Sequence, residues 1–215
     1  PRSPLGRGLG VGAGMMKMYG NRALRWIAEF YIWLFRGTPV LIQLIIIYTG
    51  LPQLGIRLTV IESAIIGLAL NEGAYLAEVI RSGIMSVDKG QTDASRAVGM
   101  TWRQRMWIVI LPQATRTIIP PLGNQFNGML KTTSLASVIS MQELMRNAQM
   151  LAQIEFRVLE AYIVTAFWYL VLVSIWSMIQ VRIEAHYEKP FGPAAAVSPD
   201  AKKDIEKILR NSGQA

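Results

Sequence analysis

The sequence predicts an all-α bundle of membrane-spanning helices, and its composition and uncharged runs carry this prediction. Of its 215 residues, 52% are hydrophobic and 17% are charged, whereas about a quarter of the residues in a soluble domain are charged. Residues 161–181 contain no charged side chain, and this run matches the roughly 20 residues that a helix needs to cross a bilayer. The predicted fold class is therefore a polytopic transmembrane helical bundle.

The N-terminal region, residues 1–36, contains two features. The uncharged stretch at residues 8–16 is too short to cross a bilayer, and we interpret it as the remnant of a first span, with a disordered glycine-rich leader as the alternative. No basic region with a cleavage site is visible, which argues against a signal peptide. Further on, apolar side chains recur at helical spacing and predict an amphipathic helix at the membrane interface: Trp26, Ile27, Phe30, Tyr31 and Leu34.

Four complete spans are predicted within a membrane domain at residues 37–189. They cover residues 37–56, 59–80, 106–130 and 161–181. The second of these runs contains three glutamates, and the third contains Arg116 and three prolines. Such interruptions are tolerated at membrane depth where neighbouring helices or a cavity satisfy the freed backbone groups. Residues 190–215 follow a Pro- and Gly-containing break and are predicted to form a soluble tail.

Lysine and arginine are distributed unequally on the two sides of the predicted spans. One side carries the basic residues before the first complete span, those of the segment 81–105 and those of the tail. The other side carries only Arg57, Lys131, Arg146 and Arg157. Because cytoplasmic loops carry the excess of positive charge, the segment 81–105 and the C-terminal tail are predicted to be cytoplasmic.

Residues 88–107 lie between two predicted spans and indicate two short helices with a bend. Thr92 or Asp93 is suited to cap the start of the first helix. Gly99 marks its end, because glycine adopts the left-handed conformation without penalty. Thr101 is then placed to cap a second helix at residues 102–107. The first helix has a face of small side chains that suits contact with another protein: Ala94, Ala97 and Val98.

The same segment resembles the EAA loop of ABC importer permeases. In that loop an acidic-Ala-Ala trio precedes a glycine and a distal hydrophobic-Leu-Pro, and here residues 93–95 read DAS, before Gly99 and the ILP of residues 110–112. Residues 93–99 alone would favour an ordinary helix-turn, but the distal ILP and the flanking spans favour the resemblance. It implies an ABC type I importer-like fold with a cytoplasmic coupling loop that docks on an ATPase through Asp93, Ala94, Ser95, Gly99 and Met100.

Further motifs between residues 36 and 145 resemble the polar amino acid permease branch of that family. They are, in order, RGTP at 36–39, GAY at 73–75, E-x-x-R at 78–81, LPQA-x-R at 111–116 and K-x-TSL at 131–135. The resemblance implies a polar or charged amino acid, or a relative such as an opine, as cargo. It also implies an ATP-binding subunit dimer, a second permease subunit, identical or homologous, and a periplasmic or surface substrate-binding protein, at the bacterial inner membrane.

Several polar side chains lie within or between the apolar runs and cannot comfortably face lipid. We interpret five of them as lining a transport pathway: Glu72, Asn124, Asn127, Lys131 and Ser134. A structural hydrogen bond is an equal alternative for Glu72, and snorkelling to the outer interface is one for Lys131. Glu78 and Arg81 are three residues apart and are predicted to pair on one helical face.

Catalysis by this chain is not predicted. It contains no GxxxxGK[ST], GxGxxG, HExxH or GxSxG motif, so ATP hydrolysis must come from a partner. The absence of cysteine and the single His186 leave no basis for a metal or cofactor site. The net charge of +8 is assigned to cytoplasmic loops and not to nucleic acid, since no nucleic-acid motif accompanies it. A self-sufficient secondary carrier or channel is the rival class, but it needs no docking loop and usually has more spans or an internal repeat.

Overall fold

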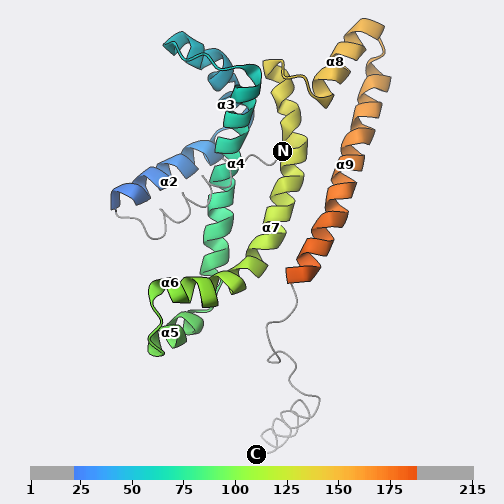
Figure 1. The fold of residues 1–215 in the computed structure, drawn as a ribbon. Coiled ribbons are helices and arrows are strands. Elements are labelled where there is room, and N and C mark those ends of the chain that lie inside the picture. The colour runs from blue at the N-terminus through green and yellow to red at the C-terminus, as the bar shows by residue number, and fades with distance from the viewer. Residues whose placement is uncertain (1–21, 188–215) are drawn as a thin grey trace, which may run out of the picture.

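A computed structural model describes residues 22–187, and the regular elements in this range are all helical (Figure 1). The predicted remnant of a first span and the predicted soluble tail lie outside the described residues. The α-helices are α2 (Arg22–Gly37), α3 (Val40–Ile45), α4 (Val60–Met85), α5 (Lys89–Ala97), α6 (Trp102–Gln104), α7 (Leu111–Thr132), α8 (Leu144–Glu155) and α9 (Val158–Tyr187). Two π-helical segments, Ile46–Gly50 and Arg105–Ile110, and two 3-10 helices, Leu51–Leu54 and Thr133–Ile139, extend them.

Three long helices form the bundle, with α7 lying between α4 and α9 and contacting both (Figure 1). By length and composition, α4 and α9 are suited to cross a membrane, and α2 together with residues 40–54 forms a bent pair that would make a third span. By length and apolar composition, the described residues thus contain two or three spans instead of the four predicted. The difference arises because α7 is too polar to count as a span. The predicted run at 106–130 is nevertheless one helical path, since Pro120 and Pro121 lie inside α7 without ending it.

The spans at 59–80 and 161–181 are confirmed as helices and are longer than predicted. Thr59 begins α4 with a capping box, in which its hydroxyl accepts from the Glu62 amide at 3.3 Å and its own amide donates to the Glu62 carboxylate at 2.8 Å. These bonds satisfy two donors that the first turn of a helix leaves free. At the other end α4 continues to Met85, where it approaches the loop that carries α5.

The predicted span at 37–56 is interrupted near its beginning. Its helical part runs from Val40 to Leu54, and its axis makes an angle of 104° with α2. The break lies at Thr38 and Pro39, where Pro39 has an extended backbone (ψ 134°) before α3 begins. Proline disfavours helical backbone at the residue before it and lacks the amide that would continue the hydrogen-bond ladder. The RGTP motif therefore makes a corner between two helices.

Small residues bring the bundle helices close together. Gly67 of α4 lies against Leu44 of α3, where an added Cβ would be 2.7 Å from the leucine Cδ2. Gly83 of α4 is covered in the same way by Ile118 of α7. The buried cluster around this second contact contains Ile84, Met106, Ile110, Ala114 and Ile118. Close approach at small residues is typical of packed membrane helices.

The predicted amphipathic helix exists as α2, and most of its large apolar side chains are exposed among the described residues. Ile32 is the exception, since it is buried and packs with Ala77 of α4. Trp26 and Trp33 are 68% and 69% exposed. The sequence pattern identified the helix correctly, and of its apolar stripe Tyr31 lies against α4 while the other members are exposed.

Candidate functional site

The first helix of the loop at residues 88–107 begins earlier in the sequence than predicted. The helix α5 starts at Lys89, and Asp88 caps it by accepting from the Gly90 amide at 2.7 Å. Neither Thr92 nor Asp93 is at the helix start. Asp93 lies in the second turn, where its carboxylate is 3.8 Å from Arg96 and both side chains are largely exposed. Asp88 acts as the cap because its side-chain oxygen accepts a hydrogen bond from an amide that the first turn of α5 leaves free.

The end of α5 follows the prediction, since Gly99 adopts the left-handed conformation with φ 78°. Its amide donates to Arg96 O at 2.9 Å, and the Met100 amide donates to Ser95 O at 3.1 Å. These two bonds form a Schellman motif, which satisfies carbonyls that the last turn would otherwise leave free. An added Cβ on Gly99 meets nothing within 4 Å, so only its backbone conformation restricts this position.

Thr101 starts the second helix as predicted. Its hydroxyl accepts from the Gln104 amide at 3.4 Å, and its own amide donates to the Gln104 side chain at 2.9 Å. The predicted end at residue 107 is not a helix end, because α6 continues through the π-helical segment Arg105–Ile110 directly into α7. Pro112 directly follows the π-helical segment, and its missing amide interrupts the hydrogen-bond ladder at that point without ending the helix. The turn at Gly99 is thus joined to a bundle helix by continuous helical backbone.

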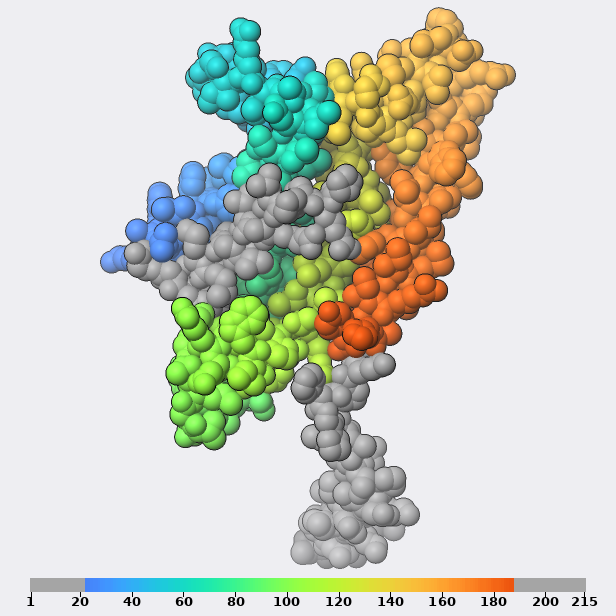
Figure 2. Space-filling model, viewed as in Figure 1, coloured from blue at the N-terminus to red at the C-terminus, as the bar shows by residue number. Residues whose placement is uncertain are grey.

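The loop presents a surface of polar and small residues, and buried side chains hold it against the bundle. Ser95 is its buried residue at 5% exposure, and the Ser95 hydroxyl donates to Thr92 O at 2.8 Å. Met106 and Ile110 fix the following segment in the cluster with Ile84. By contrast Asp93, Ala94 and Gly99 are exposed, and Figure 2 shows residues 90–110 as a block that projects at one end of the molecule. Four of the five predicted docking positions are therefore accessible at least in part, while Ser95 supports them.

Two exposed apolar side chains lie beside the turn. Val98 is 73% exposed and Trp102 is 41% exposed, and they lie immediately on either side of the turn. Val98 was predicted on the small-residue face and is the residue that follows α5, whereas Trp102 was not among the predicted docking residues. Trp102 at the first position after a threonine cap is the sequence signal that would have identified the second residue.

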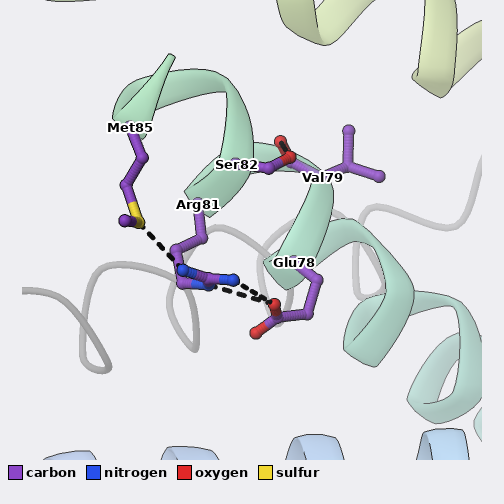
Figure 3. Close-up of polar contacts among 5 residues, drawn as sticks. All are labelled: Glu78, Val79, Arg81, Ser82 and Met85. Carbon is purple, nitrogen blue, oxygen red and sulfur yellow. Dashed lines mark hydrogen bonds and ion pairs between the residues drawn. The ribbon is translucent and has the colours of Figure 1, made fainter. Parts of the chain in front are cut away.

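The predicted pairing of Glu78 and Arg81 is confirmed near the same end of α4 (Figure 3). The guanidinium of Arg81 donates to one Glu78 carboxylate oxygen through Nε at 3.0 Å and through Nη2 at 2.8 Å. Its remaining Nη1 lies 2.8 Å from the sulfur of Met85. These contacts lie within the last turns of α4.

The predicted pathway residues lie along α7 and α4 and contact different neighbours. Glu72 of α4 accepts from Gln125 of α7 at 3.2 Å, and Asn124 accepts from Gln180 of α9, also at 3.2 Å. Asn127 has a buried amide oxygen without a hydrogen-bond partner. Lys131 is exposed in the last turn of α7. The described chain joins the first two residues to neighbouring helices and does not bring the five together.

The 3-10 helix Thr133–Ile139 carries the last predicted pathway residue, Ser134. Its hydroxyl donates to Lys131 O at 2.6 Å. The helix ends at Ser140, whose φ of 63° is left-handed. Ala136 and Ile139 bury this turn against Leu44 and Ala64, so the polar segment 123–140 consists of the last turns of α7 and a 3-10 turn packed on α3 and α4.

The family model for the inner membrane component of binding-protein-dependent transport systems matches residues 6–189 of the chain. This chain belongs to that family. The permease is 41% identical to the arginine transport system permease protein ArgU of Corynebacterium glutamicum, over 86% of this chain but only 63% of the length of ArgU. It is 42% identical to the L-cystine transport system permease protein TcyB of Bacillus subtilis, over 81% of this chain and 75% of TcyB.

A solved structure gives the same result for the fold. The permease matches the crystal structure of an amino acid ABC transporter with histidines with a TM-score of 0.80 and 39% identity, over 85% of both chains. The prediction of an all-α membrane bundle of the ABC type I importer kind is confirmed. The chain is a membrane-spanning permease subunit.

Proposed function

We propose that this permease forms the translocation pathway of an ATP-driven importer for polar or charged amino acids and drives it by docking residues 88–107 on an ATPase dimer. The observation that carries the proposal is the loop itself, a capped helix that ends at a left-handed Gly99 and continues through α6 into a bundle helix. A displacement of the exposed turn would be transmitted to the bundle through continuous helical backbone. The proposed contact surface is Asp93, Ala94, Gly99 and Met100, supported by the buried Ser95, with Val98 and Trp102 beside it.

The proposed cargo rests on the relatives. ArgU is named for arginine and TcyB for L-cystine, and both substrates are polar amino acids or are built from them. We infer a cargo of this chemical class, delivered by a substrate-binding protein, and a second permease subunit that completes the pathway. Within the membrane domain 37–189, polar side chains of α4, α7 and the following 3-10 helix are proposed to line that pathway: Glu72, Asn124, Asn127, Lys131 and Ser134.

ATP hydrolysis is expected only from the assembled transporter. The purified chain in lipid vesicles should show no nucleotide turnover, because it contains no phosphate-binding loop. Addition of the ATPase subunits and the binding protein should produce ATP-dependent uptake of labelled amino acids. Uptake by the chain alone along an ion gradient would instead establish a secondary carrier. Vesicles with the ATPase alone control for background hydrolysis.

The orientation is tested by cysteine probes, and the chain has no cysteine of its own to interfere. We propose that α2, the loop and the segment after α9 are cytoplasmic and that residues 147–157 are outside, because basic residues concentrate on the proposed cytoplasmic side. In intact cells, an impermeant thiol reagent should label Asn147→Cys and leave Gln91→Cys and Ala23→Cys unmodified. All three positions are exposed, and permeabilised cells control for reactivity. Labelling of Gln91→Cys in intact cells would contradict the orientation.

A further inference from the structure

The 104° corner between α2 and α3 is held by side-chain amides and not by backbone bonds alone. A helix that ends leaves its last four carbonyls without intrahelical partners. At the end of α2, Leu34 O accepts from the Thr38 hydroxyl at 2.8 Å, and Phe35 O accepts from two amides that belong to α3 and α4. The end of α2 is therefore tied to both following helices.

Gln43 of α3 provides the first of these amides. Its nitrogen Nε2 lies 3.0 Å from Phe35 O, 3.1 Å from Thr38 O and 2.8 Å from Thr38 Oγ1. The residue is only 7% exposed, so water does not replace these partners freely. A buried amide with this many acceptors fixes the direction in which the chain turns.

Asn71 of α4 provides the second amide and closes the arrangement. Its nitrogen Nδ2 donates to Phe35 O at 2.9 Å and to the side-chain oxygen of Gln43 at 3.1 Å. The side chains of Gln43 and Asn71, which we call the amide clasp, thus share the Phe35 carbonyl and bond to each other. Three helices meet in the clasp.

Two further contacts fasten α2 along the same face of α4. The Tyr31 hydroxyl donates to Leu70 O at 2.7 Å, and the guanidinium carbon of Arg36 lies 5.2 Å from the ring centroid of Tyr75. The partners on α4 lie on either side of Asn71 along the helix. The clasp is therefore the centre of a continuous α2–α4 contact.

The clasp is also adjacent to the contact between α4 and α7. Glu72 follows Asn71 in the chain and accepts from Gln125 of α7, and α7 is reached from the loop by unbroken helical backbone. Two successive residues of α4 therefore bond to different neighbours: Asn71 bonds to the α2–α3 corner, and Glu72 bonds to α7. Coupling between distant sites is carried by packed helices and hydrogen-bond networks of this kind, and it must be demonstrated by measured coupling.

We propose that Gln43 and Asn71 are positioning residues of the transport cycle: the amide clasp keeps the α2–α3 corner fixed on α4, so that the corner moves with α4 and α7 when the loop is displaced. This inference rests on the proposed function for its transport readout. Its structural half, a corner fixed by two amides acting as one unit, does not depend on that function.

The test uses Gln43→Met and Asn71→Leu, alone and together, in the assembled transporter. Each apolar side chain keeps approximately the native size and removes the amide. Either variant should lower import per ATP hydrolysed by about tenfold, because removing one amide breaks the Gln43–Asn71 bond and leaves a polar atom of the clasp without that partner. The double variant should be no worse than either single variant, since both remove the same unit. If the losses of import in the two single variants multiply in the double variant, the two amides do not act as one unit and the proposal is wrong.

A second measurement separates the clasp from the proposed function. Spin labels at Ala23→Cys on α2 and Ser82→Cys on α4, both exposed positions, report the α2–α4 distance distribution. The clasp variants should broaden this distribution, and an unchanged distribution would overturn the proposal whether or not the protein imports anything. If the unmodified complex does not import, the proposed function fails while the distance measurement still decides the clasp.

Two other variants complete the design. Gln53→Met is the matched control, because Gln53 is an exposed glutamine of the same helical segment, with only a 3.5 Å bond to Thr49 O, and it should behave as the unmodified protein. Thr38→Val removes one exposed acceptor of Gln43 and should broaden the distribution less, in the same direction. If the buried variants do not assemble, Thr38→Val still tests the clasp, because an unchanged distance distribution in this variant would contradict the proposal.

Discussion

Replacing Gly99 by valine should abolish import and binding-protein-stimulated ATP hydrolysis while the protein still accumulates in the membrane. Gly99 has φ 78°, a conformation that a β-branched residue adopts only with strain of about 1–3 kcal/mol. The strain is relieved if the turn changes shape, and a changed turn misplaces Ala94 and Met100 relative to an ATPase. An added Cβ meets no described atom within 4 Å, and Gly99 lies in the loop outside the bundle helices, so the bundle should still fold. Transport and immunodetected membrane levels are the measurements.

Gly55→Val is the matched control for this experiment. Gly55 is also left-handed, with φ 85° and open space around it, but it ends the 3-10 helix after α3, far from the loop in sequence. It should introduce similar backbone strain and leave stimulated hydrolysis intact. Normal transport by Gly99→Val at equal expression would show that residues 88–107 do not couple the permease to an ATPase.

The loop illustrates what the sequence could predict and what it could not. Gly99 and Thr101 were identified correctly because their local chemistry admits few alternatives: a glycine follows a short helix, and a threonine precedes Trp102 with Gln104 three residues on. The start of α5 was misplaced because Asp88, Thr92 and Asp93 are all acceptable caps. The choice depends on where α4 ends, and that is decided by tertiary packing.

The structure also weakens the expectation attached to Asp93. As a cap, Asp93 would lie at the positive end of α5, where a lysine in its place would be unfavourable. Its observed position is in the second turn, paired with Arg96 at 3.8 Å on the surface. Exposed pairs of this kind contribute about 0–1 kcal/mol. A role for Asp93 must therefore come from contact with a partner and not from stabilising α5.

The long helices were easier to predict than their contacts. Hydropathy located α4 and α9 because largely apolar runs of sufficient length have few other structures. The corner at Thr38 and Pro39 was predicted only as part of the RGTP motif, and nothing in the local sequence shows that Gln43 bonds to Asn71, 28 residues away. The Glu72–Gln125 and Asn124–Gln180 bonds join separate helices in the same way. Such pairs depend on which helices are neighbours, which a single sequence does not show.

Replacing Gly83 by leucine should have the largest effect on folding, with little assembled protein recovered. An added Cβ at Gly83 overlaps Ile118 and comes within 3.4 Å of the backbone oxygen of Ala114. Both residues belong to α7 and to the buried cluster with Ile84 and Met106. The overlap is with a buried side chain, and the remaining leucine atoms need further room against α7, so α4 and α7 must separate, and overpacking of this kind costs about 1–3 kcal/mol, occasionally more.

The measurement is the fraction of detergent-purified protein that remains monodisperse on heating. Gly128→Leu is the control, because Gly128 also lies inside a long helix, α7, and has nothing within 4 Å of an added Cβ. That variant should fold at least as well as the unmodified chain, since leucine favours a helix more than glycine by roughly 1 kcal/mol. If Gly83→Leu were equally stable, α4 and α7 would not be in the contact that places the loop beneath them, and the path from Gly99 into the bundle would need another support.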